Sequence, residues 1–277
     1  MNLNDYLKPL DPHALYGEDG EFLSHIVVNR EGIQPDALDE ASVVIVGIPW
    51  TFIPGLTPCE APDGIRKQLY RLSFDNRQNP GIYDLGNLIG ASTIRETLFG
   101  LNDVICHLLQ SGKFVLLLGG DSLANLAVLK CLPEVLGRDA CYTLAEPLVS
   151  LAEYSGFNMI DPGRIQFYQL GNQAHFLTRV QKEWIRDYVD ETYRLGKIRN
   201  HLAGAEPYLR GSDGFTLSVN LIRHADAPGQ FQAYPNGLFG EDACQLAGYA
   251  GLADHLKIVS LQDYNPSGDA GHVTASL

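Results

Sequence analysis

The chain has 277 residues, 45% of them hydrophobic, so it is long enough to bury a sizeable core as one large domain or two small ones. Its 33 acidic and 20 basic residues give a formal net charge of -13, which argues against binding to nucleic acid or to an anionic membrane surface. No apolar run reaches the roughly 18 residues of a transmembrane helix, and the start, Met-Asn-Leu-Asn-Asp-Tyr, has no signal-peptide pattern.

Strands and helices are predicted to alternate along the chain. Residues 1–40 are polar and are predicted to form an irregular N-terminal extension with one short helix near Leu3–Leu10. The predicted strands are Ser42–Gly47, Tyr83–Leu85, Phe114–Leu118, Cys141–Ala145, Ile165–Leu170, Phe215–Leu221 and Lys257–Leu261. The predicted helices are Pro62–Leu72, Thr97–Ser111, Leu123–Leu132, Arg179–Tyr188, Glu191–Leu202 and Gly240–Gly251. This alternation predicts a mostly parallel sheet with helices on both faces, and the absence of a linker favours a single domain over residues 1–277.

The rest of the chain is organised around the stretch Phe114–Ser122. Its apolar run predicts a strand that is buried on both faces. Gly119 and Gly120 then permit a sharp turn, and Asp121 and Ser122 are good N-caps for the next helix. Because ligands bind at the carboxyl ends of the strands in such sheets, Asp121 and Ser122 are expected at a binding crevice.

The cysteines give an indication of compartment. Five of them are scattered without a Cys-x-x-Cys pair: Cys59, Cys106, Cys131, Cys141 and Cys244. An odd number without pairing is typical of reduced thiols, so we expect a cytoplasmic protein. None has a sequence context that marks a catalytic nucleophile, and a free cysteine usually serves as a small buried hydrophobe.

Several short motifs follow one another between residues 42 and 277. They are Gly47-Ile48-Pro49 with Ala61-Pro62-Asp63-Gly64-Ile65-Arg66, Tyr83-Asp84-Leu85-Gly86-Asn87, Gly119-Gly120-Asp121-Ser122, Leu217-Ser218-Val219-Asn220-Leu221-Ile222 with Asp226-Ala227-Pro228-Gly229, and Asp263-Tyr264-Asn265-Pro266 with Asp269 and Thr274-Ala275. In type and order they resemble the motifs of the ureohydrolase superfamily of arginase, agmatinase and formimidoylglutamase, especially a formimidoylglutamase-like branch. The resemblance implies a three-layer α/β/α sandwich with a mostly parallel central sheet, in agreement with the predicted elements. It also implies a homo-oligomer.

The resemblance breaks down at the metal ligands. Active ureohydrolases bind two Mn²⁺ ions, which activate a bridging hydroxide, through His and Asp side chains at the strand ends. The matching positions here are Ser122, Glu146, Leu148, Ser150, Asn220 and Ile222. Only Glu146 keeps a ligand of the usual type, and without carboxylates two close cations would repel each other. The comparison therefore implies a degenerate member with no manganese cofactor and no catalytic residues.

Acidic residues are still expected at the same crevice. Asp263 stands where active members carry the carboxylate that holds a cationic substrate, and Asp121 and Glu146 should point to the same place. These acids predict a cationic small molecule, an amine or a guanidine, as the partner. The candidate ligand-binding residues are Asp121, Ser122, Glu146, Ser150, Asn220 and Asp263. The alternative is that Asp121 only caps its helix, while the other two acids pair with arginines such as Arg223.

Three functions stay open from sequence alone. The first is a degenerate ureohydrolase with a role in binding or assembly. The second is a hydrolase of linear amidines that uses a rebuilt or mononuclear metal site, for which His224 with Asp226 and Asp269 with His272 are the nearest His/Asp pairs, although exposed loop residues explain these pairs as well. The third is a metal-free binder of a cationic amine or guanidine. No Walker loop, dinucleotide-binding fingerprint or Gly-x-Ser-x-Gly elbow is present, and a Ser122 nucleophile would need a distant histidine.

Overall fold

The computed structural model describes residues 1–11, 22–53, 55, 57–73, 80–157 and 160–277. These residues form a ten-stranded sheet and a small two-stranded sheet. Strands of the large sheet, in chain order, are β1 (Leu7–Lys8), β2 (Val27–Val28), β3 (Val43–Ile48), β6 (Ile82–Leu88), β7 (Phe114–Gly119), β8 (Ala140–Ala145), β9 (Ile165–Leu170), β10 (Glu191–Tyr193), β11 (Gly214–Ser218) and β12 (Ile258–Gln262). The small sheet pairs β4 (Trp50–Thr51) with β5 (Thr57–Pro58).

The large sheet is almost entirely parallel. Its order is β1-β6-β3-β7-β12-β11-β8-β9-β10, with β2 paired to β6, and within it only β1 runs antiparallel to its neighbour among the described strands. The late strands β11 and β12 therefore enter between β7 and β8. This insertion brings the carboxyl ends of four strands from distant parts of the sequence to the middle of one sheet edge.

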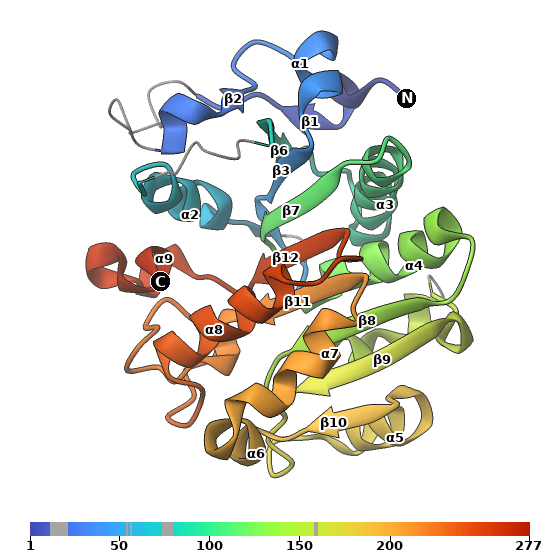
Figure 1. The fold of residues 1–277 in the computed structure, drawn as a ribbon, viewed down its shortest axis with the longest axis vertical. Helices are drawn as coiled ribbons and strands as arrows, with labels where there is room; N and C mark the ends of the chain where they lie inside the picture. The colour runs from blue at the N-terminus through green and yellow to red at the C-terminus, as the bar shows by residue number, and fades with distance from the viewer. Residues whose placement is uncertain (12–21, 54, 56, 74–79, 158–159) are drawn as a thin grey trace.

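Helices cover both faces of the sheet (Figure 1). The described α-helices are α1 (Pro35–Glu40), α2 (Ala61–Leu69), α3 (Ile94–Gln110), α4 (Asn125–Leu136), α5 (Arg179–Tyr188), α6 (Leu195–Asn200), α7 (Glu206–Arg210), α8 (Gly240–Gly251) and α9 (Val273–Ser276). Val44, Val46 and Ile48 of β3 join the core beneath α3 and α4, whereas Ile45 points to the face that α2 covers. This alternation is the period of two expected of a strand buried on both faces.

The turn after β7 forms as predicted. Gly119 and Gly120 both have positive φ, 84° and 76°, and a Cβ on Gly119 would lie 2.9 Å from the carbonyl oxygen of Ile48. Only glycine adopts this conformation readily beside a neighbouring backbone. The three-layer sandwich with its mostly parallel sheet, predicted from the sequence, is confirmed.

Two predicted segments are wrong. Residues 1–40 are not simply irregular, because β1, β2 and α1 lie there and the two strands extend the sheet; the predicted helix near Leu3–Leu10 is only a 3-10 turn over Leu3–Asp5. The predicted helix Glu191–Leu202 begins as strand β10, which pairs with β9, and only then becomes α6. Two- and three-residue strands carry too little sequence pattern to be predicted, and pairing to an existing sheet edge overrides local helix propensity.

The cysteines differ from the expectation of five reduced thiols. Cys106 of α3 and Cys131 of α4 form a disulfide with Cα atoms 5.5 Å apart. Cys59, Cys141 and Cys244 are free. The cytoplasmic compartment, which was inferred from reduced thiols, therefore stays a prediction. Among the described residues, no helix is both long enough and apolar enough to cross a membrane.

Candidate functional site

The candidate residues gather at the carboxyl ends of four neighbouring strands. Asp121 and Ser122 follow β7, Asp263 follows β12, Asn220 follows β11, and Glu146 follows β8. All five are buried, with exposed fractions of 8% or less. Ser150, the remaining candidate, lies one turn after Glu146 and donates its backbone N–H to a Glu146 carboxylate oxygen at 2.9 Å.

Both carboxylate oxygens of Asp121 accept hydrogen bonds from backbone N–H groups. One carboxylate oxygen accepts the N–H groups of Phe52 and Ile53 at 2.7 and 3.0 Å, and the other accepts the N–H of Leu123 at 3.0 Å. Burial raises the pKa of this carboxyl, while the three N–H groups oppose the rise. Asp121 therefore caps the turn that precedes α4, as predicted, and fixes the loop at residues 52–53 beside the site.

Asp263 is held in an unusual backbone conformation. Its φ is 67°, in the left-handed region that side-chain-bearing residues seldom adopt, and its N–H donates to the carbonyl of Gly120 at 2.9 Å. The Ser218 hydroxyl donates to the carboxylate at 2.5 Å. Burial raises the pKa of Asp263 to about 7; the Ser218 bond opposes this rise and the charge of Asp121 adds to it. Local backbone strain at a buried acid is typical of a functional position.

Glu146 is the second unusual acid. Burial raises its pKa well above the ordinary value, and the charge of Asp263 raises it further, whereas the Ser150 N–H favours ionisation. The charge of Asp263 thus disfavours ionisation of Glu146. We call Glu146 and Asp263 the acid pair.

No basic side chain neutralises the acid pair among the described residues. Arg223, which the sequence offered as a partner, instead binds Asp226 at 2.8 Å and lies over the ring of Phe239. The ion pairs of the described residues involve neither Glu146 nor Asp263. The alternative in which Arg223 pairs with these acids is therefore wrong.

Several buried side-chain oxygens near the strand ends lack a hydrogen-bond partner among the described residues. Four buried side-chain oxygens have no hydrogen-bond partner in the described part of the chain: Ser122 Oγ, Gln169 Oε1, Asn172 Oδ1 and Gln230 Oε1. The amide nitrogen of Gln169 donates to the carbonyl of Glu146, and that of Gln230 donates to the carbonyls of Val219 and Ile222, which fixes both amides with their oxygens free. Each of these oxygens can therefore still accept a hydrogen bond.

A buried polar network lies beside β7, β8, β11 and β12. Asn125 Oδ1 accepts the Tyr142 hydroxyl, the Thr216 hydroxyl and the Gln262 amide at 3.2, 2.8 and 2.8 Å. Asn125 in turn donates to Gln262 at 3.2 Å. A fully satisfied network of this kind rigidifies the four strands whose ends carry the acids. No sequence motif marks this network, because its members are separated by up to 137 positions.

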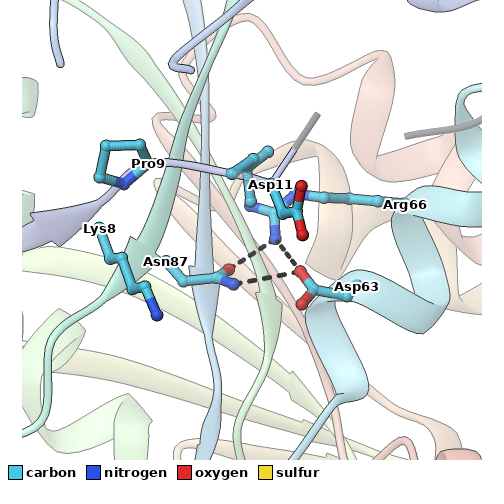
Figure 2. A pocket seen from close by; sticks show the side chains of 7 residues that line it. Lys8, Pro9, Asp11, Asp63, Arg66 and Asn87 are labelled. Atoms are coloured by element: carbon cyan, nitrogen blue, oxygen red, sulfur yellow. Dashed lines mark hydrogen bonds and ion pairs between the residues drawn. The ribbon is translucent and has the colours of Figure 1, made fainter. Parts of the chain in front are cut away.

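A second buried charge cluster explains two of the sequence motifs. Arg66 of α2 donates Nε and Nη2 to the two oxygens of Asp84 on β6, at 2.8 and 2.9 Å. Two of its remaining bonds go to Asp63 and Asn87 (Figure 2), and the third goes to the carbonyl of Gly86. Burial alone would lower the pKa of Arg66, but Asp84 more than offsets this effect and raises it.

The Arg66 cluster lies beside a pocket of about 140 Å³, which is lined by Lys8, Pro9, Leu10, Asp11, Asp63, Arg66 and Asn87 (Figure 2). The guanidinium has no donor left for a ligand, since its nitrogens already make five hydrogen bonds. This cluster therefore joins α2 to β6 and does not form a binding site.

The alternative His/Asp pairs are engaged elsewhere. Asp226 pairs with Arg223, and Asp269 accepts the Tyr264 hydroxyl and the N–H groups of Thr274 and Ala275. In the described residues, no group of three or more His, Cys, Asp or Glu side chains is placed to hold a metal ion.

Comparisons with known proteins agree with this architecture. Residues 41–142 match the family model of the arginase family. Similar solved structures include Mn²⁺-bound formiminoglutamase from Trypanosoma cruzi, with a TM-score of 0.78, 18% identity and 92% of each chain covered. A hypothetical agmatinase from Burkholderia thailandensis has a TM-score of 0.72 at 19% identity, with 94% of this chain and 87% of the other covered.

Agmatine ureohydrolase of Thermoplasma volcanium has a TM-score of 0.70 at 18% identity, with 86% of each chain covered. No curated protein matches the chain by sequence. The fold is thus that of an arginase-like α/β sandwich. The resemblance to the ureohydrolase superfamily, first drawn from the sequence motifs, is confirmed.

Proposed function

We propose that this ureohydrolase-fold protein has lost the binuclear manganese centre and binds a small organic cation at the acid pair instead of hydrolysing an amidine. The observation that carries the proposal is the acid pair itself: two buried carboxyl groups at the same edge of the sheet, with no basic partner among the described residues. A bound cation would stabilise both carboxylates at once.

The donor set at the strand ends does not fit two manganese ions. Leu148 and Ile222 have no ligating atom, and Ser122 and Asn220 offer only neutral oxygens. Asp121 already accepts three backbone N–H groups, so using it as a ligand would break the turn before α4.

The test is titration calorimetry with methylguanidinium and methylammonium chloride at pH 8 and pH 6. We expect saturable binding at pH 8 and about tenfold weaker binding at pH 6, because a carboxyl with a pKa of about 7 is only about one-tenth ionised there. Glu146→Gln and Asp263→Asn should each abolish most of the binding. Asp187→Asn, which removes an exposed acid on α5, is the matched control.

Two outcomes contradict the proposal. One is equal affinity in wild type and in both acid-pair variants. The other is release of urea, formamide or ammonia from arginine, agmatine or formimidoylglutamate when Mn²⁺ is supplied. That second outcome would favour the other candidate function, a metal-dependent hydrolase of linear amidines, which the match to the arginase family and the retained acids Glu146 and Asp263 support.

A further inference from the structure

The disulfide between Cys106 and Cys131 joins two helices that cover one face of the sheet. α3 and α4 pack against each other (Figure 1), and each carries one of the two cysteines. The Cα atoms are 5.5 Å apart, a separation that a disulfide bridges without movement of the backbone. The packing of the two helices therefore holds both cysteines in position for bond formation.

The two cysteines differ in burial. Cys131 is 0% exposed within the main core, whereas Cys106 is only partly buried at the edge of that core. Thiol–disulfide exchange begins with attack on one sulfur, so a thiol that reaches Cys106 can open the bond while Cys131 leaves. The bond is therefore accessible to reduction from the side of α3, without unfolding of the chain.

The contact between α3 and α4 does not depend on the disulfide alone. Apolar side chains of both helices belong to the same buried core, namely Leu101, Val104, Ile105 and Leu108 from α3 and Val128, Leu129 and Leu132 from α4. The amide of Asn102 also donates to the carbonyl of Ala127 across the interface, at 3.0 Å. Because this apolar burial keeps the helices associated, we expect the reduced chain to remain folded.

α4 also leads to the candidate site. It begins at Asn125, which accepts three hydrogen bonds in the polar network beside the strand ends, and Asp121 caps the turn before it. Cys131 follows Asn125 on the same helix, about 9 Å along its axis at a rise of about 1.5 Å per residue. A cross-link at Cys131 therefore restrains the part of α4 that supports the strand ends.

We propose that Cys106 and Cys131 form a reversible redox tie, which holds α3 to α4 when oxidised and lets α4 open more readily when reduced. The reductant is a dithiol. One of its thiolates attacks the sulfur of Cys106, the S–S bond breaks, and Cys131 leaves as a thiolate that takes up a proton. The second thiol of the reductant then displaces Cys106, which is likewise protonated. Two electrons thus enter the protein, and the reductant leaves as a disulfide.

The first experiment counts the thiols of the full-length chain. The folded protein is oxidised with diamide, one half is then treated with dithiothreitol without denaturant, and both halves are quenched with acid and alkylated in urea. Mass spectrometry should find three alkylated cysteines before dithiothreitol, Cys59, Cys141 and Cys244, and all five after it.

Hydrogen exchange of the two forms measures what the tie does. Reduction should speed amide exchange in α3 and α4 by about tenfold or more, because the cross-link no longer restrains local opening, and change exchange in α8 by less than about twofold. The midpoint of thermal unfolding should fall by about 5–10 °C. Cys106→Ser should match the reduced wild type with or without dithiothreitol, whereas Cys244→Ser, which removes an exposed thiol, should respond as the wild type does.

Three results would overturn the redox tie. Five alkylated cysteines after diamide would show that the bond does not form. A bond that dithiothreitol opens only in urea would be a permanent structural link. Equal exchange and equal unfolding midpoints in the two forms would show that the bond does not restrain α4. The thiol count uses wild-type protein, so it stays decisive should Cys106→Ser fail to fold. Neither the acid pair nor a cation enters these measurements, so the redox tie and the proposed cation binding succeed or fail separately.

Discussion

The Arg66 cluster and the acid pair are both buried, charged and placed on the central sheet, but they differ in how charge is balanced. Arg66 meets Asp84 through two hydrogen bonds, and further bonds to Asp63, Asn87 and Gly86 complete its donor set. Asp263 accepts a hydrogen bond from a serine hydroxyl and Glu146 accepts one from a backbone N–H, and no base pairs with either acid among the described residues.

This contrast separates a structural cluster from a candidate site. Burying a charge costs desolvation free energy. An oppositely charged partner and hydrogen bonds within the fold offset this cost. In the Arg66 cluster the buried charges of Arg66 and Asp84 are paired and hydrogen-bonded to each other. The acids of the acid pair have no such partner in the described part of the chain. The free-energy cost of burying their negative charge is therefore offset by protonation or by a ligand. The following predictions test that difference.

The largest effect is expected in the Arg66 cluster. Arg66→Ala leaves Asp84 buried without its cation, and should cost about 3–5 kcal/mol of unfolding free energy. Urea denaturation at pH 7 measures it. Arg210→Ala, which removes an exposed partner of Glu206, is the control and should cost less than about 1 kcal/mol. If both variants lost a similar amount of unfolding free energy, the buried Arg66–Asp84 pair would contribute no more to stability than an exposed pair.

Neutralising an acid of the acid pair should raise the free energy of unfolding, whereas Arg66→Ala lowers it. The unfolded state ionises Asp263 near its ordinary pKa, and the folded state only near about 7. The folded state therefore binds more protons between these values, and stability falls as pH rises through this window, by roughly 4 kcal/mol for this buried group.

Asp263→Asn should remove most of this pH dependence and stabilise the cation-free protein at pH 8. Urea denaturation from pH 4 to pH 8 measures both effects. A stability curve for Asp263→Asn that is parallel to wild type across the window would contradict the assignment of the slope to Asp263.

The two serines at the site should behave differently. Ser218→Ala removes the hydroxyl that donates to Asp263, so at pH 8 it should cost about 1–3 kcal/mol. Ser122→Ala removes a hydroxyl with no hydrogen-bond partner, and should change stability by less than about 0.5 kcal/mol. Thermal unfolding of the two variants at pH 8 gives the comparison, and equal losses would mean that Ser122 is paired after all.

The sequence predicted most of the central sheet because its strands are long, apolar and bounded by glycine or polar residues. The Gly119-Gly120 turn and the Asp121 cap followed from residue chemistry alone and are observed. The edges of the sheet were missed, since β1, β2 and β10 are two or three residues long and form only by pairing with a neighbour.

The sequence indicated the carboxylates of the candidate site, but not the other side chains around them. Motif resemblance predicted Glu146 and Asp263 at one crevice, and the structure places them after β8 and β12, at the same edge of the sheet. The free oxygens of Gln169 and Gln230 carry no motif. Gln169 lies beside Glu146 because β9 pairs with β8, which residue spacing does not specify.

The most direct test of the central claim is the manganese content of the purified full-length chain, before and after incubation with Mn²⁺, by elemental mass spectrometry. Our account predicts no stoichiometric manganese in either sample, because the strand ends lack the ligands for it. Two equivalents per chain, retained through gel filtration and lost in a Glu146→Gln variant, would contradict the account and favour metal-dependent amidine hydrolysis.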